Sequence, residues 1–184
     1  MLLNSIENTN LDGKRVIIRV DFNVPLTDGL VVDNFRIKAS LPTIKYCLNA
    51  GASVVLMSHM GRPNGKIVPS LSLDPVAFEL EDLLNKEVMF SNDCISEDSI
   101  GLSQQLKQGE IHLLENLRFH KGESENDETF SWFLSRHADI YINDAFGTAH
   151  RAHASNVGIT KYIDKIYSGL LLDKEIHYLY NNLN

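Results

Sequence analysis

The sequence has few cysteines and no long apolar run. These two features argue against a disulfide-stabilised protein and against a membrane protein. Cys47 and Cys94 are its only two cysteines and form no Cys-x-x-Cys pair, so we expect reduced thiols in a cytoplasmic protein. A chain of 184 residues can bury roughly 70% of its unfolded surface, so the fold needs no disulfide. No apolar stretch approaches the roughly 20 residues that span a bilayer, and the N-terminal residues have no basic and apolar pattern, so we expect no secretory signal.

Positive charge is also scarce. Lysine and arginine total 17 against 24 acidic residues, which gives a net charge of −7. This balance argues against nucleic acid or an anionic membrane as the main partner, because such surfaces attract a basic protein face. A small anionic ligand remains compatible, provided that Arg, Lys or His side chains gather locally.

Nucleotide-binding and metal-binding motifs are absent or incomplete. The stretch 61–66 has one residue too few between its glycines for a phosphate loop, and Ile67 stands where Ser or Thr would bind magnesium. No Gly-x-Gly-x-x-Gly occurs. His150 and His153 could bind a metal on one helix face but lack a third ligand, so we expect no metal site. Carboxylates at predicted strand ends are expected to bind arginines rather than to act as acid and base; they are Glu115, Glu123 and Asp144.

The order of apolar segments predicts an α/β fold. Four short apolar runs end abruptly in polar, glycine or arginine residues, and a weaker strand follows at 87–90; the four runs are 15–20, 53–57, 111–114 and 140–142. Continuous apolar runs indicate strands buried on both faces. Helices are predicted at 40–49 (closed by Gly51), at 74–84, after Asn126 and at 168–183. We expect a doubly wound, Rossmann-like and mostly parallel sheet, with helices on both faces in three layers.

Polar residues that follow these strands predict an anion site. The set comprises Asp21, Asn23, Arg36, His59, Arg62, Arg118 and Arg151. Guanidinium groups grip phosphate and carboxylate oxygens through paired donors, and Asp or Asn can bind a hydroxyl. A ligand with a phosphate, a carboxylate and a hydroxyl between them would use every residue type. A single arginine at a strand end is usually a solvated or salt-bridged surface residue, so the prediction depends on the set.

Four motifs resemble the phosphoglycerate kinase family, in that family's order and across almost the whole chain. They are RVDFNVPL at 19–26, SHMGRP at 58–63, LENLRF at 114–119 and NDAFGTAHRAHAS at 143–155. The resemblance implies reversible phosphoryl transfer between 1,3-bisphosphoglycerate and ADP. It implies that 3-phosphoglycerate is bound by Asp21, Phe22, Asn23, Arg36, His59, Met60, Gly61, Arg62, Arg118 and Arg151. Arg36 is similar to the arginine that steadies the transferring phosphoryl group and is the predicted catalytic residue.

The resemblance also implies what this chain lacks. The family's second half carries the site for Mg-ATP or Mg-ADP, so we expect no cofactor to bind within these 184 residues. Residues 1–167 would form the substrate domain and 168–184 the start of the interdomain helix, in a cytoplasmic monomer whose partner is its own C-terminal domain. The isolated chain is expected to bind substrate without catalysis. A stand-alone anion-binding or regulatory module and an interaction domain without a ligand are the alternatives.

Overall fold

A seven-stranded parallel sheet forms the centre of the molecule. The computed structural model describes residues 4–183. The strand order is β1 (Asn4–Ser5), β9 (Lys165–Ser168), β8 (Ile140–Asn143), β2 (Arg15–Arg19), β5 (Ser53–Met57), β7 (Ile111–Leu114) and β6 (Val88–Ser91). Every neighbouring pair in this sheet is parallel. A separate antiparallel hairpin joins β3 (Leu26–Thr27) and β4 (Leu30–Val31).

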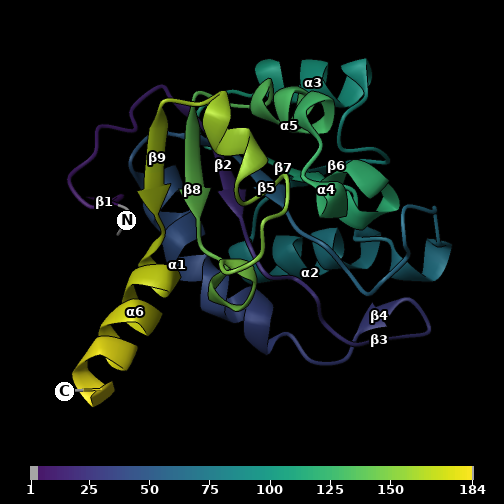
Figure 1. The fold of residues 1–184 in the computed structure, drawn as a ribbon, viewed down its shortest axis with the longest axis horizontal. Coiled ribbons are helices and arrows are strands. Elements are labelled where there is room, and N and C mark those ends of the chain that lie inside the picture. Colours follow the sequence, from purple (N-terminus) through teal and green to yellow (C-terminus); the bar gives the residue numbers. More distant parts are fainter. Residues whose placement is uncertain (1–3, 184) are drawn as a thin grey trace.

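Helices cover both faces of the sheet, which confirms the three-layer prediction (Figure 1). One face carries α1 (Phe35–Asn49) and α2 (Asp74–Leu84), and the other carries α3 (Glu97–Gln104), α4 (Lys121–Glu125) and α5 (Glu128–Ser135). Consecutive side chains of β2 enter opposite cores. Val16 and Ile18 pack in the core on the α1 and α2 face, and Ile17 packs in the core on the α5 face. This alternation explains why the strands have continuous apolar sequences.

The sheet reverses its direction of growth beside β2. The chain adds β5, β6 and β7 on one side of β2 and then crosses to place β8 and β9 on the other side. In open α/β sheets such a reversal leaves a crevice outside the carboxyl ends of the strands. The loops that follow β2 and β8 therefore meet at the expected ligand-binding edge.

Some element boundaries differ from the prediction. Helix α1 begins at Phe35 rather than near residue 40, because the Asp33 carboxylate accepts the Phe35 amide at 2.9 Å and starts the helix earlier. Pro42 consequently lies inside the helix instead of in its first turn. Likewise α6 (Leu170–Leu183) begins after Ser168, which belongs to β9. Neither α3 nor β9 was predicted from the sequence.

The two cysteines lie in different cores of the molecule. Cys47 and Cys94 are free and buried, in the cores on opposite faces of the sheet. Among residues 4–183, no helix has both the length and the apolar character needed to cross a bilayer. Helix α6 packs against α1 and then extends away from the body of the molecule (Figure 1).

Candidate anion-binding site

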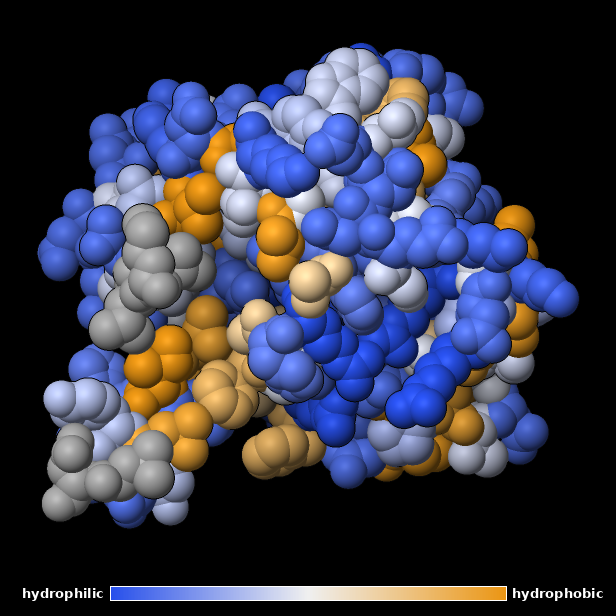
Figure 2. All heavy atoms as spheres, viewed as in Figure 1, coloured by the Kyte–Doolittle hydropathy of each residue, from blue (hydrophilic) through white to orange (hydrophobic). Residues whose placement is uncertain are grey.

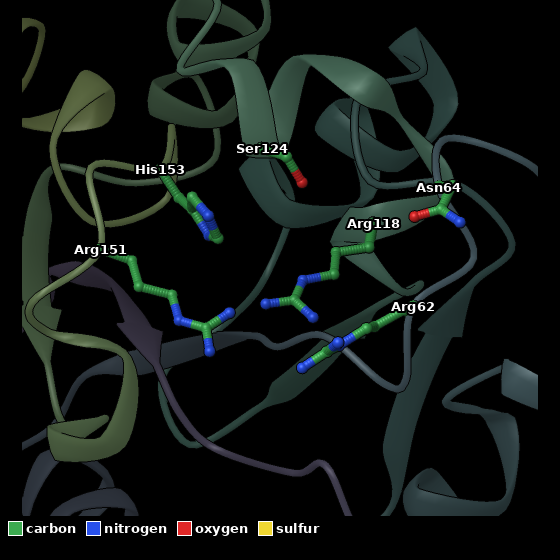
Figure 3. Close-up of a pocket in the computed structure, with 6 residues that line it drawn as sticks. All are labelled: Arg62, Asn64, Arg118, Ser124, Arg151 and His153. Carbon is green, nitrogen blue, oxygen red and sulfur yellow. The ribbon is translucent and has the colours of Figure 1, made fainter.

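A basic cavity lies where the loops after several parallel strands meet. Its volume is about 180 Å³, and Arg62, Arg118 and Arg151 line it together with Asn64, Ser124 and His153. Figure 3 shows the three guanidinium groups converging on one space from separate segments of the chain. In the space-filling view, hydrophilic side chains cover this part of the surface (Figure 2). Three of the four predicted arginines are thus brought together.

Arg118 follows the end of β7 and is fixed by contacts with neighbouring turns. It lies in the 3-10 turn η2 (Leu117–Phe119), which Asn116 caps by accepting the Arg118 amide at 3.0 Å. The guanidinium Nη1 donates to the Gly61 carbonyl at 2.9 Å, and only 8% of the residue is exposed. Burial lowers the pKa of Arg118, and the positive charge of Arg151 adds to this effect. An anion in the cavity would relieve this repulsion.

The loop that carries Arg62 is shaped by Asn23 and Gly61. The Asn23 side-chain oxygen accepts the Gly61 amide at 3.0 Å. Gly61 has φ +60°, and a Cβ at this position would lie 2.9 Å from the Leu71 side chain. Glycine is required here because the backbone is left-handed and the space is occupied. Asn23 therefore positions the arginine loop.

Two predicted residues can contact a ligand only through the backbone. The side chains of Phe22 and Met60 are buried in the core on the α1 and α2 face. The Phe22 amide donates to the Ser58 hydroxyl at 2.9 Å, and the Met60 amide donates to Asn116 at 3.1 Å. These bonds fix the turns at the ends of β2 and β5.

Arg36 lines a neighbouring cavity. This cavity, of about 270 Å³, also includes Asp21, Asp144, Phe146 and Leu171. Arg36 Nη1 lies 2.9 Å from Asp21 Oδ2, and 52% of the Arg36 side chain is exposed. Arg36 lies in the first turn of α1, and α1 covers the face of the sheet opposite α4. The fourth predicted arginine is therefore near the basic cavity without lining it.

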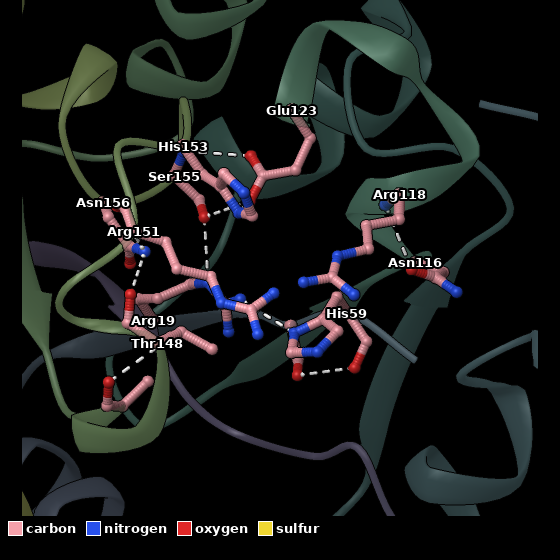
Figure 4. Close-up of polar contacts among 12 residues, drawn as sticks. Arg19, His59, Asn116, Arg118, Glu123, Thr148, Arg151, His153, Ser155 and Asn156 are labelled. Carbon is pink, nitrogen blue, oxygen red and sulfur yellow. Dashed lines mark hydrogen bonds and ion pairs between the residues drawn. The ribbon is translucent and has the colours of Figure 1, made fainter. Parts of the chain in front are cut away.

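Arg19, which sequence reasoning did not select, is the fully buried centre of the polar network (Figure 4). Its Nε donates to the Ser155 hydroxyl at 2.9 Å, Nη2 lies 3.0 Å from His59 Nδ1, and Nη1 donates to the Val20 carbonyl. Burial lowers the pKa of Arg19, whereas the nearby Glu123 carboxylate opposes that shift. An arginine inside an apolar strand was the sequence signal for this role.

Glu123 joins this network to the loop that bears Arg151. The carboxylate accepts the Ser155 amide at 2.9 Å and the Ser155 hydroxyl at 2.6 Å. The Glu123 backbone carbonyl accepts the Ala154 amide at 2.9 Å, and His153 Nδ1 lies 3.9 Å from the carboxylate. Glu123 is fully buried, so these contacts replace its lost hydration.

His59 is held as a neutral hydrogen-bond donor. Burial, followed by the charge of Arg19, lowers the pKa of His59 to about 2. Arginine can only donate, so His59 Nδ1 must accept from Arg19 and the ring proton must lie on Nε2. The imidazole is thereby fixed in the tautomer that carries its proton on Nε2.

Comparison with known proteins decides the family. The sequence model of phosphoglycerate kinase matches residues 6–184. The chain belongs to the phosphoglycerate kinase family. It is 53% identical over 175 residues to the phosphoglycerate kinase of Moorella thermoacetica, covering 95% of this chain and 44% of that protein. It is 48% identical over 178 residues to that of Prochlorococcus marinus strain MIT 9515, covering 96% and 44% of the two chains.

Solved phosphoglycerate kinase structures have the same fold. The structure from Coxiella burnetii superimposes with a TM-score of 0.86 at 39% identity, covering 97% of this chain and 44% of that one. The structure from Pyrococcus horikoshii OT3 gives 0.86 at 35% identity, covering 97% and 45%. The chain therefore spans less than half the length of these phosphoglycerate kinases, and it matches their N-terminal part.

Glu115 and Asp144 bind backbone amides rather than the arginines that the sequence predicted. Glu115 accepts the Leu73 amide at 2.8 Å, and Asp144 accepts the Leu171 amide at 3.0 Å. Burial raises the pKa of Asp144 to about 6. Within residues 4–183, neither His150 nor His153 belongs to a group of three potential metal ligands.

Proposed function

We propose that this chain is the 3-phosphoglycerate-binding part of a phosphoglycerate kinase, which transfers a phosphoryl group reversibly between 1,3-bisphosphoglycerate and ADP. The observation that carries the proposal is the convergence of Arg62, Arg118 and Arg151 on one cavity. Together they supply paired donors for phosphate or carboxylate oxygens. His59 adds a neutral N–H donor at the same edge of the sheet.

Arg36 is proposed to act on the transferring group rather than on the distal phosphate. Its support is its place in the neighbouring cavity, where it is half-exposed and paired with Asp21. Phosphoryl transfer depends on positioning and on stabilising charge that develops in the transition state, and a guanidinium group can do both. Asp21 would hold Arg36 until substrate binds, and Asn23 and Gly61 would maintain the loop that bears Arg62.

The magnesium nucleotide is proposed to bind outside these 184 residues. The only phosphate-loop-like stretch lacks the spacing and hydroxyl residue that a nucleotide site requires. Residues 168–184 would begin the connection to a nucleotide domain that closes on this one and excludes water. The whole enzyme is proposed to be a cytoplasmic monomer, and this chain alone to bind substrate without turning it over.

Calorimetric titration of the 184-residue chain with 3-phosphoglycerate tests the proposal. Arg151→Ala should weaken binding by about 1.5–3 kcal/mol, the usual contribution of a charged hydrogen bond. Arg136→Ala is the matched control, because Arg136 pairs with Glu97 and lies over Trp132 outside the cavity. Equal binding by wild type and Arg151→Ala would contradict the site assignment. Phosphoryl transfer to ADP by this chain would contradict the proposal that the chain alone binds substrate without turning it over.

A further inference from the structure

A second cavity lies next to the anion site and is lined by acidic rather than basic side chains. It measures about 220 Å³, and its lining includes Asp93, Cys94, Glu115 and His120. Neither lysine nor arginine is among the described residues that line it. The turn η2 separates the two cavities, since Arg118 faces the basic one and His120, two residues later, faces the other. Such a lining favours a cation rather than an anion.

Three of these side chains are close enough to share one ion. The ligand atoms of Asp93, Cys94 and His120 all lie within 4.8 Å of one another. His120 Nε2 and Asp93 Oδ1 are already 3.3 Å apart. Zinc bonds of about 2.0–2.3 Å in a tetrahedral site separate ligand atoms by roughly 3.3–3.8 Å. The Cys94 sulfur therefore needs to approach the other two ligand atoms by at most about 1.5 Å.

The protein holds these groups in place without an ion. Asp93 follows β6, and its Oδ1 also accepts the Ile95 amide at 2.7 Å, which fixes the carboxylate beside the strand end. Cys94 is 1% exposed and packs in the core on the α5 face. The His120 ring lies against Phe130, with 5.4 Å between the ring centroids. The three potential ligands are therefore held beside one another, Asp93 and Cys94 after β6 and His120 after η2, before any ion binds.

We propose that Asp93, Cys94 and His120 form a binding site for a soft divalent cation, with zinc as the best match. Thiolate and imidazole prefer zinc to magnesium or calcium, and the adjoining cavity has room for a water molecule as fourth ligand. On binding, the Cys94 thiol gives its proton to the buffer as the Zn–S bond forms, while the His120 imidazole and the Asp93 carboxylate donate lone pairs. This site is separate from the one proposed for 3-phosphoglycerate.

Titration of the chelator-treated 184-residue chain with Zn²⁺, and separately with Co²⁺, tests this site. We expect one Zn²⁺ per chain, release of about one proton and a thiolate-to-Co²⁺ charge-transfer absorption. Cys94→Ser should abolish the absorption, while Cys47→Ser, which alters the buried cysteine of the opposite core, should leave it intact. Asp93→Asn and His120→Gln change partly exposed side chains, so these variants should fold.

Each of those two variants should lower Zn²⁺ affinity by more than the roughly 10–100-fold that loss of an outer-shell partner costs. His150→Gln should leave the affinity unchanged, because His150 lies outside the cluster. The proposal is overturned by the absence of stoichiometric Zn²⁺ binding, or by Co²⁺ binding without the thiolate absorption. It is also overturned if Asp93→Asn and His120→Gln bind Zn²⁺ as tightly as the wild-type chain.

Discussion

At the residue scale, the anion cavity depends on buried charges that do not line it. Arg19 and Glu123 are both fully buried, and Ser155 bridges them through hydrogen bonds of 2.9 and 2.6 Å. Removing one partner of such a network leaves the other charge without compensation in a medium that solvates it poorly. Glu123 also anchors the backbone at Ala154, close to Arg151. Stability and the position of a ligand-binding arginine are therefore linked through Glu123.

Glu123→Gln should destabilise the protein by about 3–5 kcal/mol, because it leaves the Arg19 charge buried without its carboxylate. Urea unfolding followed by circular dichroism would measure the change. Glu125→Gln is the matched control, since Glu125 is exposed on the same short helix, and its effect should stay within about 0.5 kcal/mol. A Glu123 variant as stable as the control would mean that Arg19 does not need the charge.

At the scale of elements, the start of α6 is tied directly to the end of β8. Asp144 Oδ1 accepts the amides of Leu171 and Leu172 at 3.0 and 3.2 Å. The approach is close, since a Cβ on Gly169 would lie 2.1 Å from that oxygen. Asp144 also precedes the segment that carries Arg151. A single carboxylate therefore connects the base of the terminal helix with the loop beside the basic cavity.

Asp144→Ala should expose both amides and cost about 0.5–2 kcal/mol, the usual range for loss of a helix cap. Hydrogen exchange at Leu171 and Leu172 should accelerate before exchange in the central strands changes. Asp144→Asn retains an oxygen acceptor and should preserve most of the protection. Unchanged exchange at these two amides in the alanine variant would show that Asp144 does not hold the helix start.

At the scale of the whole molecule, neutral histidines are built into the core beneath the sheet edge. His137 Nε2 donates to the Cys94 carbonyl, so its Nδ1 accepts from Ser103, whose oxygen then accepts from His112 Nδ1. His112 Nε2 in turn accepts from Ser91 at 2.6 Å. This directional chain leaves no place for an added proton. Burial, with a contribution from His137, lowers the pKa of His112 to about 3.

The free energy of unfolding should consequently fall as the pH is lowered from 7 to 5. Histidine in the unfolded chain takes up protons near pH 6.5. In the folded state, burial first and then like charges lower the pKa of His59 to about 2 and burial lowers that of His137 to about 4, so acid favours the unfolded chain. Asp144 acts in the opposite direction, because its raised pKa of about 6 lets the folded state bind a proton first, but three histidines outweigh it.

Urea unfolding at several pH values would measure this dependence. His112→Gln should reduce the slope by up to about 1.4 kcal/mol per pH unit, the equivalent of one proton. A stability that is constant from pH 7 to 5 would contradict the neutral buried histidines.

Much of the fold could be predicted because its signals are local. The run from Ser53 to Met57 is apolar at every position after its first residue, and a strand buried on both faces needs that composition. Gly51, with φ +84°, ends α1 as predicted. The start of that helix was placed too late because Pro42 is typical of a first turn, whereas the Asp33 carboxylate began the helix at Phe35.

The sequence by itself determined the parallel sheet, the family and three arginines of one cavity. These features could be predicted because a buried strand, and the motif at its end, each consist of residues that are consecutive in the chain. Only the tertiary structure decided that Arg19 is buried, that Arg36 lines a different cavity, and that His120 meets Asp93 and Cys94. Burial and distance depend on segments that are far apart in the chain. Their effects on charge and on ligand geometry therefore arise only when those segments pack together.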